Sequence, residues 1–243
     1  MFKRVLYLIF FIPLLLGCQQ SSLQSNPITK ENLTQITTIL KEAHLSNINT
    51  FEQWVNNHNI ENPNATDPSD ADCRMTVMLL TGDSIEYTHL NKNYTGDYLM
   101  FDLDLIENHK NFEILKEKKD LFTTLFGEMP IPDSGIEQAL PSHWKKHNIH
   151  ISNKDISIIS IVFKTMDKEE VFVGHTGLWI PVDNGYAFIE KIAFYEPFMI
   201  TYVKDENQLM DFLSKRKDYT TEKEEPSPLV YKNDTLIGTL TTT

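Results

Sequence analysis

The sequence predicts an α+β fold, in which helices come first along the chain and an antiparallel sheet follows. Apolar residues recur at helical spacing in segments up to residue 126, whereas several segments after residue 155 have the composition of strands. Between two of these strands, Asp183-Asn184-Gly185 is a strong turn signal. The chain of 243 residues is long enough to bury a full core. We therefore expect residues 29–243 to form a single domain.

The first residues have the pattern of an export signal. Basic residues at positions 3 and 4 precede an apolar run, residues 5–16, that is too short to span a bilayer comfortably. The run ends in Leu15-Leu16-Gly17-Cys18, which resembles the lipobox of bacterial lipoproteins. This resemblance implies that residues 1–17 are removed and that Cys18 is linked to diacylglycerol. The mature protein would then be anchored to the outer face of a bacterial membrane, unless the segment is an ordinary signal peptide with a chance cysteine.

Helices are expected where apolar residues recur at helical spacing or where a capping residue precedes such a run. Residues 18–28, which are polar and rich in Ser and Gln, are predicted to be a flexible tether before them. The expected helices cover residues 32–43, 50–55, a segment capped by Asp72 or Asp70, 99–126 with a break near 108–111, and 205–215. The expected strands cover residues 156–163, 171–180 and 186–194, with 229–240 as a further edge strand after a charged linker at 220–228.

The acidic composition excludes some partners. The formal net charge is −12 at pH 7, so the protein will not bind nucleic acid or anionic lipid through charge. We interpret this acidity as a contribution to solubility. After the leader, no stretch approaches the length of a transmembrane helix. No cofactor is predicted.

Cys73 is the candidate nucleophile, because an unpaired thiol in an exported protein has no disulfide partner once Cys18 is acylated. It stands in Asp72-Cys73-Arg74, where a loop is expected to become a helix. The free N–H groups and the dipole at a helix start favour a thiolate and stabilise an oxyanion. Asp72 is expected to cap this helix, and Arg74 to add positive charge beside the sulfur. The alternative is that Cys73 is a small buried apolar residue.

His175 is the candidate base and lies in Gly174-His175-Thr176-Gly177, within an expected strand. It would accept the proton of the thiol and later protonate the leaving amine. The flanking glycines are typical of a place where substrate or a helix backbone comes close to a strand. The alternative is a histidine that is simply held by hydrogen bonds within the sheet.

Together these motifs resemble the NlpC-type papain-like cysteine peptidases. The matching residues are Asp72-Cys73 at a helix start, His175-Thr176-Gly177 on a strand and Glu190 on the next strand. The chain also looks like a family of bacterial lipoproteins with a comparable Cys-Arg and Gly-His-x-Gly pairing. That second likeness covers most of the mature chain but brings no established activity.

The resemblance to the NlpC-type peptidases carries implications for fold and activity. It implies a papain-like fold with N-terminal helices packed on an antiparallel sheet. It also implies hydrolysis of peptide bonds in bacterial cell-wall peptidoglycan. Because Cys73 and His175 are farther apart in the sequence than in that family, a helical insertion around residues 81–153 is required.

Glu190 is the third candidate and is expected to orient the imidazole of His175. A two-residue turn at Asn184-Gly185 would set a register in which Glu190 faces Trp179, on the face that also carries His175. Four residues along a strand span about 13 Å, so a direct bond would need a wider loop or a bulged, strongly twisted hairpin. The alternative for Glu190 is an acid that faces solvent.

His143, His147 and His150 also invite a metal site, because the first two are four residues apart. Metal sites of this kind need further Cys, His or carboxylate ligands nearby. No nearby Cys or paired carboxylate completes such a set, so no metal site is predicted.

These observations support three hypotheses about function. The first is a lipid-anchored cysteine hydrolase that acts on an amide bond, with a cell-wall peptide as the substrate that the resemblance implies. The second is a non-catalytic surface lipoprotein of the same fold that binds a ligand or a partner. The third uses the same Cys–His pair for acyl transfer. All three place the protein in the cell envelope, attached to a membrane through Cys18.

Overall fold

The structure is a computed structural model that describes residues 23, 25–63, 70–219 and 226–240. The predicted signal peptide and the lipidation residue Cys18 lie outside the described residues. So does most of the predicted charged linker, because residues 220–225 are not described.

An antiparallel sheet dominates the described part of the chain. Its main path runs in the order β1-β8-β7-β6-β5-β9-β10, and β3 pairs with β6 outside that path. In the same order the strands are β1 (Ser25–Pro27), β8 (Phe198–Val203), β7 (Gly185–Lys191), β6 (Glu170–Val182), β5 (Ser157–Lys164), β9 (Leu229–Lys232), β10 (Thr235–Thr239) and β3 (Met129–Pro130). A separate two-stranded ladder joins β2 (Ile85–Glu86) and β4 (His150–Ile151).

Most of the helices precede the long strands in the chain. The α-helices are α1 (Lys30–Glu42), α2 (Ile48–Val55), α3 (Cys73–Thr81), α4 (Met100–Asn108), α5 (Glu113–Lys116), α6 (Lys119–Phe126), α7 (Ala139–His147) and α8 (Glu206–Ser214). A π-helical turn follows α2 (Asn56–Glu61), and short 3₁₀ turns are η2 (Gly82–Ser84), η3 (Lys110–Phe112), η4 (Ile136–Gln138) and η5 (Lys217–Tyr219). The predicted α+β class is therefore confirmed.

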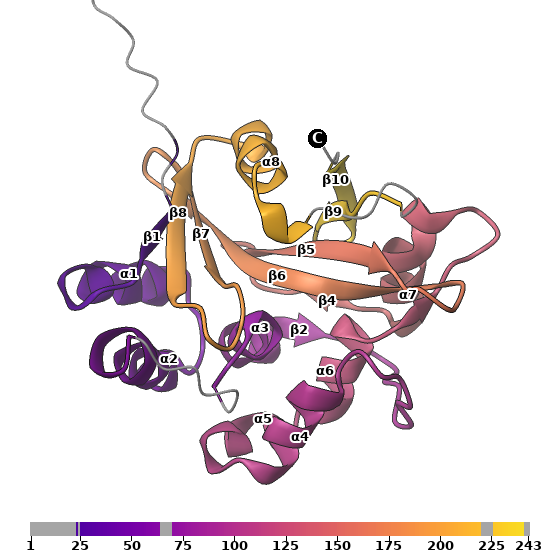
Figure 1. Cartoon of the computed structure of the whole chain (residues 1–243), viewed down its shortest axis with the longest axis horizontal. Helices are drawn as coiled ribbons and strands as arrows, with labels where there is room; N and C mark the ends of the chain where they lie inside the picture. Colours follow the sequence, from indigo (N-terminus) through magenta and orange to yellow (C-terminus); the bar gives the residue numbers. More distant parts are fainter. Residues whose placement is uncertain (1–22, 24, 64–69, 220–225, 241–243) are drawn as a thin grey trace, which may run out of the picture.

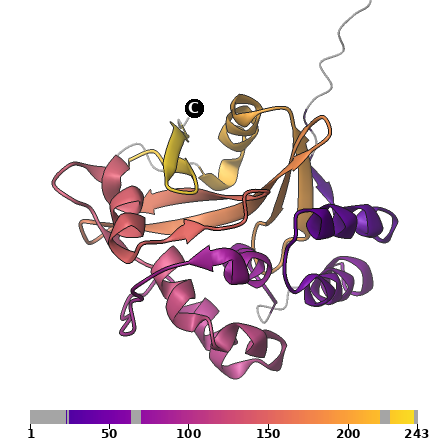
Figure 2. The ribbon, with the colours of Figure 1, turned by 180° about the vertical axis from the view of Figure 1, so that it is seen from behind.

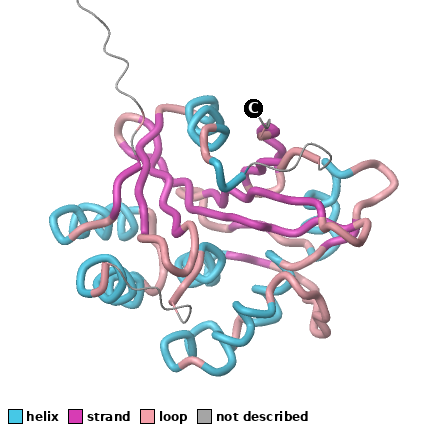
Figure 3. The backbone as a smooth tube through the Cα atoms, viewed as in Figure 1, coloured by secondary structure: helices cyan, strands magenta, loops and turns pink. Residues whose placement is uncertain are grey.

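The sheet lies between two unequal helical layers. Helices α1 to α6 lie on one face and α8 lies on the other, as Figure 1 shows and the reverse view in Figure 2 repeats. The tube in Figure 3 shows the long strands β5 and β6 running across the middle of the molecule. We call the two sides of the sheet the α3 face and the α8 face.

Each face has its own hydrophobic core. The α3 face buries Leu178 and Ile189 against the helices, together with Met75 of α3. The α8 face buries Trp179 and Phe188 in a smaller core with residues of α8. Successive residues of a strand point to opposite faces, except where a bulge interrupts the alternation. The β5–β6 register shifts once, between Ile161 and Val162, so His175 and Val173 lie on opposite faces of β6.

The β6–β7 hairpin differs from its predicted register by two residues. The structure pairs Val182 with Gly185, so the turn residues are Asp183 and Asn184, not Asn184 and Gly185. Gly185 has a φ of 137°, and a Cβ there would lie 2.2 Å from the carbonyl oxygen of Val203 in β8. Because β8 comes so close, a side chain would not fit at the first residue of β7, and glycine is required there. As a result Glu190 faces Gly177 instead of Trp179.

Three other expectations are corrected. Residues 25–27, predicted as part of the tether, pair with β8 as an edge strand. The predicted helix at 99–126 breaks near residues 108–111 as expected, but a second break, between α5 and α6, was not predicted. The predicted strand at 186–194 ends at Lys191, because its ammonium group donates to the carbonyl oxygens of Ala193, Phe194 and Glu196 and so curls the chain back.

Gly177→Ala should destabilise the fold, because the new Cβ would lie 2.5 Å from the ring of Phe188 and 2.9 Å from the carbonyl oxygen of Ile189. We expect the free energy of unfolding in urea to fall by about 1–3 kcal/mol, as overpacked positions do. Gly238→Ala is the matched control, because its Cβ would meet only the flexible end of Met210. Equal losses in the two variants would contradict this explanation of Gly177.

Candidate functional site

The start of α3 is fixed by Asp72. Its backbone is extended, and its Oδ1 accepts a hydrogen bond of 2.8 Å from the N–H of Met75. Its carbonyl oxygen also accepts a hydrogen bond from the hydroxyl of Thr76. This N-cap makes Cys73 the first residue of the helix, as the sequence predicted. Cys73 is a free cysteine and only 3 % exposed.

Arg74 joins the first turn of α3 to two other elements. Its Nε and Nη2 donate to the carboxyl of Asp102 in α4, at 3.2 and 2.9 Å. Nη2 also lies 3.0 Å from Oδ2 of Asp72, and Nη1 donates to the carbonyl oxygen of Val173 in β6. The side chain is 12 % exposed, so its charge is paired in a largely dry setting. The predicted role of Arg74, positive charge beside the sulfur, is compatible with this position.

The thiol of Cys73 is uncharged at neutral pH. Burial is the largest cause, and with the neighbouring carboxylate of Asp72 it raises the pKa of Cys73 to about 12. Arg74 and a hydrogen bond from the Thr176 backbone act in the opposite direction but do not compensate. The helix start therefore does not produce a thiolate in this structure.

His175 and Glu190 are brought together as the sequence suggested. Glu190 faces Gly177, two residues from His175 along β6, so the two side chains are diagonal neighbours on one face. Nε2 of His175 lies 2.7 Å from Oε2 of Glu190, and both side chains are buried. An ionised carboxylate only accepts hydrogen bonds, so Nε2 carries the proton. The lone pair of a neutral imidazole is thus at Nδ1.

Arg216, just after α8, completes this pair. Its Nη1 donates to both carboxylate oxygens of Glu190, at 2.8 and 2.7 Å. The ring of Tyr219 lies 5.6 Å from the imidazole of His175, centroid to centroid. Burial acts to raise the pKa of Glu190, but His175 and Arg216 outweigh it and hold that pKa below its ordinary value. Glu190 is therefore ionised, and it is not the solvent-facing acid of the alternative interpretation.

The two halves of the predicted triad approach β6 from opposite sides. His175 pairs with Ile161, which belongs to the core of the α8 face. Cys73 belongs to α3 and reaches the backbone of Thr176 from the other face. Within the described residues, no hydrogen bond joins the thiol to the imidazole. The structure thus brings His175 to Glu190, and Cys73 to Asp72 and Arg74, as two separate clusters.

A third buried cluster lies beside them, where β7 ends. The side chain of Lys191 is fully buried and its Nζ lies 3.4 Å from Oδ2 of Asp70. The same carboxylate pairs with His58. Burial is the main cause that lowers the pKa of Lys191 to about 8, although Asp70 counteracts it. Lys191 also acts on the carboxylate of Asp72, so this cluster adjoins the start of α3.

Sequence reasoning missed five of the residues that build these clusters. They are His58, Asp70, Lys191, Asp102 and Arg216. Of these five residues, the sequence analysis singled out only Asp70, as a possible helix cap. Asp102 lies in a predicted helix and Arg216 stands beside charged residues, and ionisable side chains are common in such segments. The partners of both residues are also distant in the sequence.

The histidines considered for a metal site contact backbone carbonyl oxygens or a single carboxylate. Nε2 of His143 lies 2.8 Å from the carbonyl oxygen of Thr124, and Nδ1 of His147 lies 2.8 Å from that of His89. His150 pairs with the carboxylate of Glu86. No group of three or more His, Cys, Asp or Glu side chains suited to a metal ion occurs in the part of the chain that the structure describes.

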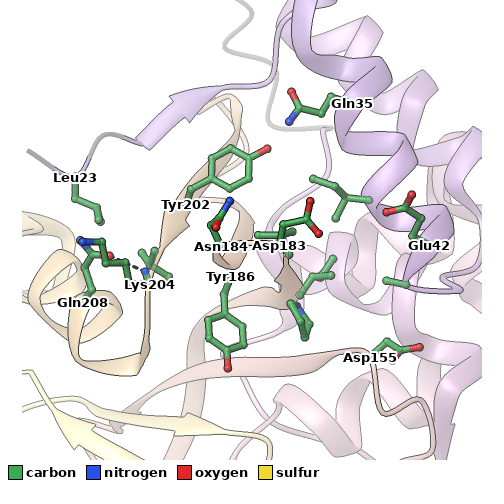
Figure 4. Close-up of a pocket in the computed structure, with 16 residues that line it drawn as sticks. Leu23, Gln35, Glu42, Asp155, Asp183, Asn184, Tyr186, Tyr202, Lys204 and Gln208 are labelled. Atoms are coloured by element: carbon green, nitrogen blue, oxygen red, sulfur yellow. Dashed lines mark hydrogen bonds between the residues drawn. The ribbon is translucent and has the colours of Figure 1, made fainter. Parts of the chain in front are cut away.

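An open cavity of about 860 Å³ lies away from these clusters, at the tip of the β6–β7 hairpin. As Figure 4 shows, Gln35 and Glu42 of α1 stand on one side of it, and Tyr186 and Tyr202 stand on the other. Tyr186 is held in place by stacking on Trp179, with ring centroids 4.4 Å apart. The cavity therefore offers fixed aromatic surface beside polar groups, a combination common in ligand sites.

Comparison with known protein families gives one match. The family described as "Domain of unknown function (DUF4300)" matches residues 60–237, which include Cys73, His175 and Glu190. No curated protein and no solved structure matches the chain. Across the residues that the structure describes, no helix combines the length and apolar character needed to cross a membrane.

Glu190→Gln should destabilise the protein at pH 7 by about 3 kcal/mol, because it removes the buried carboxylate that both Arg216 and His175 contact. The pKa of Glu190 is lowered by folding, so its stabilisation is complete above the unfolded pKa of about 4.3 and is lost as pH falls through the folded value. Urea unfolding at a series of pH values should show the gap between wild type and variant shrinking only below that point. A gap that stays constant down to pH 3 would contradict an ionised Glu190.

Alkylation of Cys73 by iodoacetamide should show no plateau between pH 7 and 10, because its pKa is raised to about 12. Peptide mapping by mass spectrometry follows this residue separately from Cys18. In urea the same cysteine should titrate near the ordinary value of about 8.5. A midpoint below 8 in the folded protein would refute the neutral thiol.

Proposed function

We propose a function for this chain, which belongs to the DUF4300 family of domains of unknown function: it is a lipid-anchored cysteine hydrolase that acts on an amide bond. Cys73 is the nucleophile, His175 the base and Glu190 the group that orients the imidazole. Cys18 carries the lipid, and the protein acts in the cell envelope at the outer face of a bacterial membrane. The fold is of the papain-like NlpC type within the α+β class.

The concentration of buried ionisable groups around one stretch of β6 supports this proposal most strongly. Asp72 and Asp102 lie on the α3 face, Glu190 and His175 on the α8 face, and Lys191 beside them, each less than 5 % exposed. Burying charge is costly even when the charges are paired, and such groups gather where chemistry requires them. A sheet that only needed stability would bury apolar residues at positions 175, 190 and 191.

In the proposed reaction, the thiol of Cys73 transfers its proton to Nδ1 of His175 and the sulfur attacks the substrate carbonyl. The N–H groups of the first turn of α3 stabilise the oxyanion. The amide C–N bond breaks, the imidazolium protonates the leaving amine, and an acyl-enzyme remains. Water then releases the acid, with His175 as base. The resting thiol is neutral, and the backbone of β6 lies between it and His175. The proposed reaction therefore requires β6 to rearrange, so that the sulfur and the imidazole meet on one side of the strand.

The substrate class comes from the resemblance to NlpC-type peptidases alone. That resemblance favours a peptide of the cell wall, and the predicted lipid anchor would hold the protein near such a substrate. The net charge of −12 is compatible with an uncharged or cationic peptide.

Incubation of the mature protein with purified muropeptides tests the proposal. Wild type should release new amino groups that mass spectrometry detects, whereas Cys73→Ala and His175→Ala should be slower by about 100-fold or more. His150→Ala is the matched control, because its ring is exposed and pairs with Glu86 in β2. No release by wild type, or equal release by Cys73→Ala, would overturn the hydrolase.

A second candidate function is ligand binding without catalysis by a surface lipoprotein of the same fold. The raised pKa of the buried Cys73 and its separation from His175 favour this candidate, as does the cavity at the β6–β7 tip. Tyr202, which is 41 % exposed there, offers its ring to a ligand.

Calorimetric titration with the same muropeptides separates the two functions. For the binding protein, affinity should be unchanged in Cys73→Ala, reduced in Tyr202→Ala, and not followed by any new amine. Turnover that depends on Cys73 would reject this second candidate.

A further inference from the structure

We propose that Asp72 and Asp102 share one proton, so that Asp102 is a neutral carboxylic acid that positions Arg74 and keeps a second negative charge away from Cys73. Asp102 lies in a segment where the sequence offered no candidate. The consequence for the thiol rests on the proposed function, whereas the shared proton follows from the contacts of the two carboxyl groups.

The first reason is the position of the two carboxyl groups. Oδ2 of Asp72 and Oδ2 of Asp102 both contact Nη2 of Arg74, at 3.0 and 2.9 Å. Two ionised carboxylates that converge on one nitrogen are acceptors only and repel each other. One retained proton removes this repulsion and lets one carboxyl group donate to the other.

The second reason is the balance of charge in a dry setting. The side chains of Asp72 and Asp102 are 5 % and 1 % exposed, and they share a single guanidinium. Two carboxylates in one site would leave an excess negative charge that water cannot screen. One retained proton makes the cluster of Asp72, Asp102 and Arg74 neutral.

The proton belongs on Asp102. Asp72 accepts the N–H of Met75 and feels both Arg74 and Lys191, which together hold its pKa below the ordinary value despite burial. Burial and the nearby Asp72 raise the pKa of Asp102 well above its ordinary value, and Arg74 only partly offsets them. Such a pair titrates as a unit, with the two carboxyl groups pushed apart.

The charges around this pair are contributed by several elements. Cys73 and Arg74 lie on α3, Lys191 comes from β7, and Tyr94 from the loop before α4 interacts with Arg74. Burial raises the pKa of Tyr94, so its hydroxyl is neutral. Both aspartates act to raise the pKa of Cys73. Loss of the shared proton would therefore make thiolate formation harder and reduce activity at alkaline pH.

Infrared spectroscopy of the mature protein at pH 7 tests the shared proton directly. Wild type should show the C=O stretch of a protonated carboxylic acid, and both Asp102→Asn and Asp72→Asn should lose it. In either variant the remaining aspartate has no carboxylate neighbour and ionises beside Arg74. Asp183→Asn, which changes an exposed carboxylate in the β6–β7 turn, should retain the band.

Each outcome decides the matter. No acid band in wild type means that both aspartates are ionised, and a band that survives Asp72→Asn means that Asp102 is protonated by burial alone. Either result overturns the proposal. Asparagine also caps helices, so Asp72→Asn still provides the test if Asp102→Asn fails to fold. Because Cys73→Ala should keep the band, a failed hydrolase assay leaves this test intact.

Discussion

The guanidinium of Arg74 is the group on which the rest of the site depends. It bonds to Asp72 at the start of α3, to Asp102 in α4 and to the backbone of Val173 in β6. These bonds join two helices and the sheet at one point, so the first turn of α3 cannot slide along β6. Because the pairing is buried, removing Asp72 would leave the charge of Arg74 uncompensated. The position of Cys73 is a consequence of this constraint.

The α8 face repeats the same arrangement with different residues. There an arginine, Arg216, binds the carboxylate of Glu190, which in turn holds the imidazole of His175. The backbone of β6 separates this cluster from Cys73. One arginine–carboxylate pair thus lies beside Cys73 and another beside His175, in surroundings of low dielectric where these interactions are strong. In this rigid arrangement the thiol of Cys73 is neutral, and it ionises only if its surroundings change.

Part of this could be predicted from the sequence because it is encoded locally. The cap at Asp72, the helix start at Cys73 and the common face of His175 and Glu190 follow from capping preference and from the period of a strand. The two-residue shift of the hairpin preserved that face and brought Glu190 closer to His175. The shift itself depends on the approach of β8 to Gly185, which no local pattern encodes.

The ion pairs that complete the site could not be predicted either, because no local sequence pattern encodes them. Asp102 lies 28 residues from Arg74, and Arg216 lies 26 residues from Glu190. Such pairs are set by tertiary packing and leave no periodic signal in the chain. The early end of β7 is similar, because it depends on which carbonyl oxygens the buried Lys191 reaches.

The most direct test of the central claim is to look for an acyl group on Cys73 during turnover. Muropeptide and mature protein would be mixed, quenched in acid, digested and mapped by mass spectrometry. We expect the peptide that contains Cys73 to gain the mass of the acyl half of the substrate, and His175→Ala to prevent it. An unmodified Cys73 while product accumulates, or the absence of any product, would contradict the assignment of this buried thiol as a nucleophile.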